Sequence, residues 1–288
     1  MASPPQSFPL DRSIFNETLY SRLRDFWLAG VPQDATSPPW EAIQRWFGPG
    51  MTQEQKDALD RSCHSNFGEA LNALGPEKLA LPAFESYEDD LGKAEIISSP
   101  LLKEVREAHS ESVEGGAKRL LSLVVLLDQM PRNIYRDLDG LGLVYGHYDR
   151  LSFSLLRSSM KLEPNMMGED CVKMRPVWLS WLTIPFMHCE HLPSHELYLK
   201  YARATRQIFH EKNDTAAVQY LDRNIEFELK HIEPLEKFGR YPHRNAALGR
   251  KSTAEEEEYM KSGATFGVTQ QKKVEQEDEK KDDPKDEL

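Results

Sequence analysis

Hydrophobic residues recur along this chain at spacings of three and four positions, which is the period of an amphipathic α-helix. Phe15, Leu19 and Leu23 begin the first series, and a longer series over residues 59–74 follows a capping box of Thr52 and Gln55. Alternation at every second position, the mark of a strand, is absent. The same period predicts further helices over residues 101–111, 141–160, 176–187, 194–211 and 215–238, and one that opens with a second capping box of Ser252 and Glu255.

The most apolar stretch, residues 120–127, is hydrophobic nearly all round. Such a helix is packed on every side, so we expect it at the centre of the fold, ended by Pro131. Residues 81–100 carry acidic residues, Gly92 and two prolines with little periodicity. We predict a long surface connection there.

Helices of this length joined by short turns form antiparallel hairpins. The predicted fold class is therefore all-α, an antiparallel helix-hairpin array without a sheet. We expect a flexible N-terminus over residues 1–13, a single helical domain over 14–267 with an inserted loop at about 82–114, and a disordered charged tail over 268–288. Residues 269–288 hold five basic and eight acidic side chains and only two aliphatic ones, too few to offset the entropy of ordering.

The 288 residues carry 36 basic and 47 acidic side chains, a net charge of −11. A chain without a basic stripe lacks the cations that neutralise phosphates, so we expect no nucleic-acid partner. It has no run of about 18 apolar residues, so we expect no membrane span. Three scattered cysteines and an N-terminus without an apolar signal sequence favour a cytoplasmic protein, in which the C-terminal Lys-Asp-Glu-Leu is inert as a retrieval address.

Three stretches hold polar residues that helix packing does not require. In the first, Asp128 lies in the predicted last turn of the most apolar helix, where burial and the helix dipole both oppose a bare carboxylate. It needs a cation, which Arg132 beyond the helix end or an arginine from elsewhere could supply. Asn133 could contact a ligand or only shape the turn. The alternative for this stretch is a buried ion pair that ties the helix end to its neighbours.

The second stretch follows Gly239, a predicted left-handed helix cap, on a loop stiffened by Pro242. If this loop and the first stretch face one cavity, its arginines and Arg132 form a basic lining inside an acidic protein, which would attract a small anion. The alternative is that they cap helix carbonyls and pair with Asp128 and Glu190. The polar residues of this loop are Arg240, His243, Arg244, Asn245 and Arg250.

The third stretch is His188-Cys189-Glu190-His191, with His195 nearby. His188 and Glu190 could form a proton-transfer pair, because histidine titrates near neutrality and a neighbouring carboxylate raises its basicity. A zinc or iron site is a weaker alternative, since the spacing of metal-binding motifs is missing, and no cofactor is predicted. Cys189 as a nucleophile is weaker still, because cysteine is more often a buried packing residue.

In this order, the three stretches resemble a helical domain-of-unknown-function family, number nine hundred and twenty-four, best known from bacteria and also found in fungi. The resemblance covers residues 18–266. It implies a compact all-α fold similar to tetratricopeptide arrays, and it implies no activity. The stretch at about 82–114 is longer than the family's usual connection and could remodel a cavity. Residues that match the family's motifs are Asp128, Pro131, Arg132, Asn133, His188, Glu190, Gly239, Arg240, Pro242, His243, Arg244, Asn245 and Arg250.

These observations favour a pocket that binds a small anionic metabolite. If the pocket is catalytic, His188 or His243 would be the acid–base group, Glu190 or Asp128 would orient the ring, and arginines would hold a carboxylate or phosphate. The alternative is an interaction module that binds a protein partner on a concave helical face, with the polar stretches serving structure. The predicted ligand-binding residues are Arg132, Asn133, Arg240, Arg244, Asn245 and Arg250.

Overall fold

A computed structural model describes residues 8–261 and 263. Every regular element in this part of the chain is helical, which confirms the predicted all-α class. Two elements, η1 and η2, are π-helical turns, and η3 and η4 are short 3-10 turns. In chain order the elements are α1 (Glu17–Trp27), α2 (Trp40–Phe47), α3 (Gln53–Ala73), α4 (Tyr87–Ile97), α5 (Ser99–Glu111), α6 (Val113–Val124), η1 (Val125–Gln129), α7 (Met130–Ile134), α8 (Leu138–Leu143), η2 (Val144–Tyr148), α9 (Asp149–Ser159), η3 (Met166–Gly168), α10 (Asp170–Lys173), α11 (Pro176–Met187), α12 (Leu192–Glu211), α13 (Thr215–Phe238), η4 (Pro242–Arg244) and α14 (Ala254–Tyr259).

The helix predicted to be central is central. α6 packs against α1, α5, α9 and α11, and Leu120, Leu121 and Val124 have no exposed surface. Each such side chain stabilises the fold by roughly 1.5–3 kcal/mol on leaving water. The core around α6 therefore fixes where the segments that follow it emerge.

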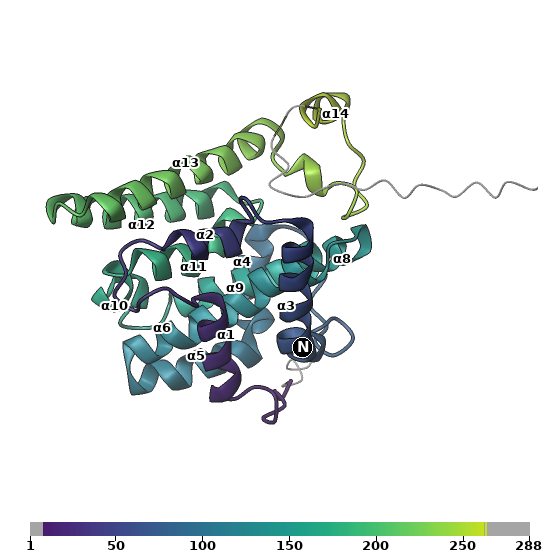
Figure 1. Cartoon of the computed structure of the whole chain (residues 1–288). Coiled ribbons are helices and arrows are strands. Elements are labelled where there is room, and N and C mark those ends of the chain that lie inside the picture. The colour runs from purple at the N-terminus through teal and green to yellow at the C-terminus, as the bar shows by residue number, and fades with distance from the viewer. Residues whose placement is uncertain (1–7, 262, 264–288) are drawn as a thin grey trace, which may run out of the picture.

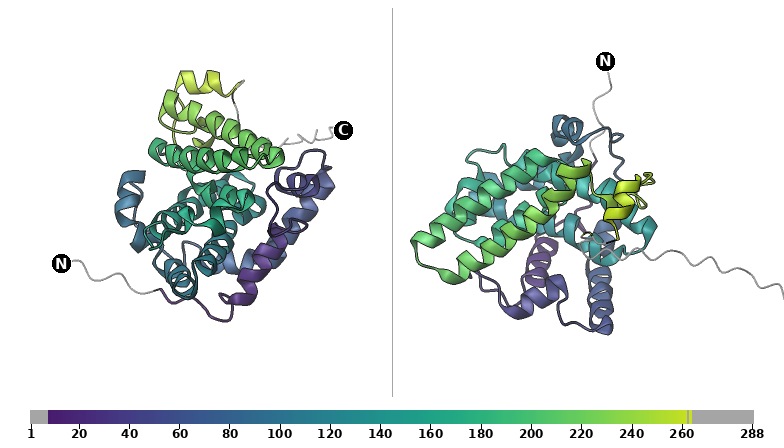
Figure 2. Two further views of the ribbon diagram at one scale, coloured as in Figure 1. Left: turned by 90° about the vertical axis from the view of Figure 1, so that its left-hand side faces the viewer. Right: turned by 90° about the horizontal axis from the view of Figure 1, so that it is seen from above.

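The longest hairpin, α12 and α13, lies across one side of the other helices (Figure 1), as the two turned views also show (Figure 2). Its turn is tight because Asn213 adopts a left-handed backbone at φ 59° and the Asp214 carboxylate caps α13 through the Ala217 N–H. Gly239, at φ 71°, ends α13 as predicted. This helix end delivers the arginine-rich loop to the rest of the fold.

The predicted surface connection over residues 81–100 is wrong, because α4 and the start of α5 occupy most of it. Ser86 caps α4 by accepting a hydrogen bond from the Asp89 N–H. One face of α4 is buried, and it carries Asp90 rather than an apolar residue. That buried carboxylate interrupts the apolar period, and its partner Arg150 lies 60 residues away in the sequence.

Pro131 does not end the central helix. In η1 the Met130 N–H donates to the Val125 carbonyl, five residues back, so the helix widens by one residue and continues as α7. Pro131 lies in the first turn of α7, where its missing N–H is tolerated. Arg132 therefore lies inside a helix, not beyond its end.

Two other expectations change or remain open. The second capping box forms one residue later than predicted, between Thr253 and Glu256. The predicted tail over residues 268–288 lies outside the described residues, and the single-domain organisation stays a prediction.

Candidate functional site

The two π-helical turns carry polar residues of one buried cluster. η1 contains Asp128, η2 contains Tyr145, and Asp149 follows η2 directly. η1 and η2 lie in contact, and π-helical turns inside α-helices occur frequently at functional sites. We call Asp128, Arg132, Tyr145, Asp149, His188 and Arg244 the polar cluster.

Asp128 and His188 form a hydrogen-bonded pair inside this cluster. His188 follows the last residue of α11, and its Nδ1 lies 2.8 and 2.9 Å from the two carboxylate oxygens of Asp128. Gln129 donates to the same carboxylate at 2.6 Å, and Arg132 lies 3.7 Å from it. Burial opposes the charge of Asp128, but Arg132 and then His188 lower its pKa below the ordinary value.

His188 is a neutral base held in one orientation. Burial, and then the charge of Arg132, lower the pKa of His188 against the opposing effect of Asp128. With Nδ1–H donated to the carboxylate, the lone pair lies on Nε2, which makes no hydrogen bond with any described residue. The side chain is 17% exposed, so Nε2 can accept a proton from a bound molecule.

Glu190 does not pair with His188, as the sequence suggested it could. Arg250 grips its carboxylate with two hydrogen bonds of 2.6 and 2.8 Å, and the Tyr241 N–H donates to it at 2.8 Å. These contacts lower the pKa of Glu190 although burial opposes the charge. Asp128 is the carboxylate that orients His188, which was the other option the sequence left open.

Three of the four predicted arginines are held by carboxylates in two-toothed ion pairs, and so do not form the expected basic lining. Arg132 binds Asp149 at 2.7 and 2.9 Å, and Arg240 binds Glu256 at 2.7 and 2.9 Å, as Arg250 binds Glu190. Such geometry uses the guanidinium fork fully. These arginines fasten α7 to α9, and the loop after α13 to α14 and to the turn after α11.

The two predicted asparagines also serve packing. Asn133 donates to the Gln129 carbonyl at 2.9 Å, which supports the π-helical turn. Asn245 donates to Ser252 and to Glu256 at 3.1 and 3.2 Å. We therefore leave both out of the candidate binding surface.

Arg244 differs from the other arginines. It is 4% exposed, and its guanidinium lies against the rings of Tyr145 and Tyr241, 4.4 and 4.7 Å from their centres. Its acidic contact is a long one, 3.4 Å to an oxygen of Asp149 that Arg132 already holds. The Arg244 Nε and the Tyr145 hydroxyl are both buried without a hydrogen-bond partner.

His243 is a poor acid–base group. Burial, and then the charges of Arg244 and other neighbours, lower its pKa to about 2. A base this weak stays neutral throughout the physiological range. Of the two predicted acid–base histidines, His188 has the better surroundings.

His195, the more distant member of the suggested metal site, is committed elsewhere. Its Nδ1 lies 2.7 Å from Glu228 Oε1 and its Nε2 lies 2.8 Å from the Cys189 carbonyl oxygen. Burial opposes the charge, but the contacts with Cys189 and Glu228 raise the pKa of His195 to about 10. Within residues 8–261 and 263, no three His, Cys, Asp or Glu side chains are arranged to hold a metal ion.

Sequence reasoning missed Asp149 and Tyr145. Residues 140–146 were examined only as a failed dinucleotide fingerprint, with glycines at 140, 142 and 146. A signal was present in the pair Asp149-Arg150, because two charges placed directly before the largely apolar run 151–156 imply buried partners. Both are in fact buried and paired.

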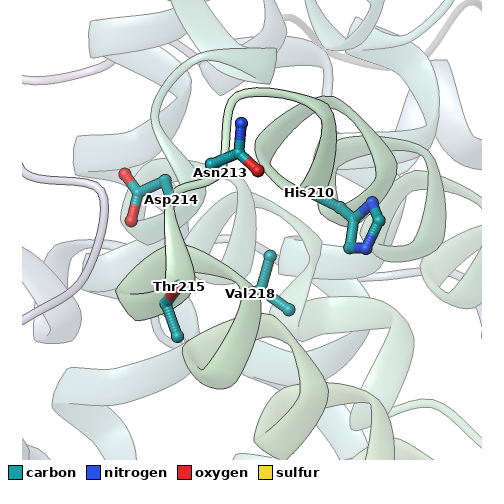
Figure 3. Close-up of a pocket in the computed structure, with 5 residues that line it drawn as sticks. All are labelled: His210, Asn213, Asp214, Thr215 and Val218. Atoms are coloured by element: carbon teal, nitrogen blue, oxygen red, sulfur yellow. The ribbon is translucent and has the colours of Figure 1, made fainter.

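A separate hollow of about 260 Å³ lies at the turn between α12 and α13 (Figure 3). Asp214 on its wall already caps α13 and accepts a hydrogen bond of 2.7 Å from the Thr36 hydroxyl. None of the predicted site residues lines it, so it adds nothing to the polar cluster. Its lining residues are His210, Asn213, Asp214, Thr215 and Val218.

In the described part of the chain, no helix has the length and apolar character needed to cross a membrane. None of the curated proteins matches the sequence. A solved structure of a protein of unknown function from Agrobacterium tumefaciens is 20% identical, with a TM-score of 0.44, over 85% of this chain and 98% of that chain. The family described as "Bacterial protein of unknown function (DUF924)" matches residues 23–264. That match confirms the resemblance seen in the sequence, and the chain therefore belongs to this family.

Proposed function

We propose that the polar cluster binds a small molecule that carries an oxyanion, with Arg244 and Tyr145 as hydrogen-bond donors and His188 as an acid–base group beside them. The observation that carries the proposal is the unused hydrogen-bonding capacity of Arg244. A buried charged donor without a partner costs about 1–3 kcal/mol or more, so native folds rarely keep one without a reason. An oxyanion would accept from both Arg244 Nε and the Tyr145 hydroxyl.

The surroundings favour a ligand over a missing internal partner. The nearest carboxylate, Asp149, is already held by Arg132 through both of its oxygens. The aromatic rings on Arg244 support its cation but accept no conventional hydrogen bond. A bound oxyanion would therefore give Arg244 the two-toothed partner that Arg132, Arg240 and Arg250 already have.

The charge balance of the cluster connects the oxyanion to His188. Asp128 and Asp149 balance Arg132 and Arg244, and His188 is neutral. An added anion leaves the cluster with one excess negative charge, which favours proton uptake by His188. The chemistry that fits is removal of a proton from an O–H or an acidic C–H near the oxyanion, with Nε2 as the base and Asp128 holding the ring.

Replacement of Arg244 tests this proposal. Phosphate, sulfate and malonate, at ionic strength held constant with chloride, should raise the melting temperature of the wild-type protein, and Arg244→Gln should abolish the increase. The matched control is Arg206→Gln, which removes an arginine paired with Asp222 between α12 and α13. Equal increases in Arg244→Gln and wild type would reject the anion site.

A further inference from the structure

The inserted segment, residues 82–114, holds α4 at a fixed position beside the polar cluster. α4 packs on α9 (Figure 1). Arg150, next to Asp149 at the start of α9, binds Asp90 of α4 at 2.7 and 2.8 Å and the Pro82 carbonyl at 2.8 Å. Since Asp149 faces the cluster, this buried pair sets the position of α4 relative to it.

Tyr87, the first residue of α4, is packed between α9 and the turn that carries Glu190. Its ring meets Phe153 edge-on at 5.2 Å and lies nearly parallel to His191 at 6.4 Å. It is 7% exposed, and its hydroxyl makes no hydrogen bond with any described residue.

The Tyr87 hydroxyl also lies in the electrostatic field of the cluster. Burial, and then Cys189, raise the pKa of Tyr87, while Arg244 opposes the increase. The phenol therefore stays protonated and remains a donor. Tyr87 in turn helps to raise the pKa of Arg244, after Asp149 and Tyr145. The hydroxyls of Tyr87 and Tyr145 are thus two neutral donors near one under-used guanidinium.

We infer that Tyr87 supplies a further hydrogen bond to the anion held by Arg244 and Tyr145, and so makes the site selective for a tetrahedral phosphoryl or sulfuryl group over a carboxylate. This inference rests on the proposed function. A carboxylate has two oxygens in one plane, which the fork of Arg244 satisfies. A phosphate or sulfate has further oxygens out of that plane for the two phenols. The inserted segment is then a wall of the site, and Tyr87 is its specificity-determining residue.

The test compares phosphate with acetate on wild type, Tyr87→Phe and Arg244→Gln, by calorimetric titration at constant ionic strength. Tyr87→Phe keeps the ring that packs on Phe153 and removes only the donor. We expect its Kd for phosphate to rise about tenfold, as for one hydrogen bond to a charged group, and its Kd for acetate to change less than twofold. Tyr220→Phe, which removes the hydroxyl of an equally buried tyrosine on α13, is the matched control.

The outcomes separate this inference from the proposed function. Unchanged phosphate affinity in Tyr87→Phe, with binding lost in Arg244→Gln, overturns the role of Tyr87 and leaves the anion site intact. Equal weakening toward phosphate and acetate overturns the selectivity. Wild-type protein that binds neither anion, or Arg244→Gln that binds both as wild type does, overturns the proposed function and this inference with it.

Discussion

At the scale of single residues, the buried carboxylates determine what the polar cluster can do. Asp128 and Asp149 are 0% and 3% exposed, and burial of a carboxylate is costly unless cations and donors surround it. Asp128 has Gln129, His188 and Arg132 around it, and Asp149 is shared by two arginines. Such pairs add little net stability when complete, yet removing one member is strongly destabilising.

Asp128→Ala should lower the free energy of unfolding by about 3–5 kcal/mol. The change leaves the His188 Nδ1–H and the Gln129 amide buried without an acceptor. Urea denaturation measures it. Asp222→Ala, which breaks a half-exposed ion pair with Arg206, should cost less than about 1 kcal/mol. A transition of Asp128→Ala that coincides with wild type would refute the buried pairing.

Anion binding should be accompanied by proton uptake at His188. The pKa of His188 is lowered without ligand, and a nearby anion raises it. Affinity for phosphate should therefore increase as the pH falls between the pKa values of the bound and unbound states. Calorimetry in buffers of different ionisation enthalpy counts the protons. His188→Gln should abolish the uptake, and the same uptake in that variant would assign the proton to another group.

At the scale of elements, the hydrophobic period predicted what depends on local sequence. The bounds of α11 and α13 match the predicted 176–187 and 215–238, because each helix has a sharp stop or start such as Pro176 or Gly239. α4 was missed because its buried face includes Asp90, and the π-helical turns were missed because no local residue pattern specifies an extra residue per turn.

The same limit applies to the candidate site. The three polar stretches were found because their charges are unusual beside apolar helices, and they do meet. Which charge pairs with which could not be predicted, since Arg132–Asp149 and Arg250–Glu190 depend on how helices distant in sequence cross. Tyr87 was invisible because its segment was interpreted as a loop.

Two glycine replacements test the helical interpretation of the inserted segment and its fit to the core. Gly92 lies inside α4 with nothing within 4 Å of an added Cβ, so Gly92→Ala should stabilise by about 0.5–1 kcal/mol. At Gly116, where α6 approaches α5, an added Cβ would lie 2.7 Å from the His109 Cβ, so Gly116→Ala should destabilise by about 1–3 kcal/mol. Chemical denaturation of both variants measures this. No gain from Gly92→Ala would contradict the helix over residues 87–97.

At the scale of the whole molecule, an acidic protein holds neutral histidines in its interior. Burial lowers the pKa values of His147, His188, His231 and His243, whereas His195 is raised to about 10. A group with a lowered folded-state pKa contributes stability above its unfolded value of 6.5 that is lost as the pH falls. His195 does the reverse, and its contribution is lost as the pH rises from 6.5 to about 10.

Stability should therefore fall on both sides of neutrality. Below pH 6.5 the unfolded chain binds protons that the folded state excludes. His243 alone, with its folded pKa at about 2, should account for a loss of about 2 kcal/mol between pH 6.5 and pH 5. Urea denaturation of wild type and His243→Asn at both pH values isolates this contribution, and an identical pH dependence in the two proteins would show that His243 is protonated in the folded state.

The most direct test of the anion site is the position of a heavy oxyanion in crystals of the protein. Selenate is tetrahedral like phosphate and gives an anomalous signal. We predict an anomalous peak within hydrogen-bond distance of the Arg244 guanidinium and the Tyr145 hydroxyl. Selenate bound only at surface lysines and arginines, with no peak at Arg244, would contradict the account.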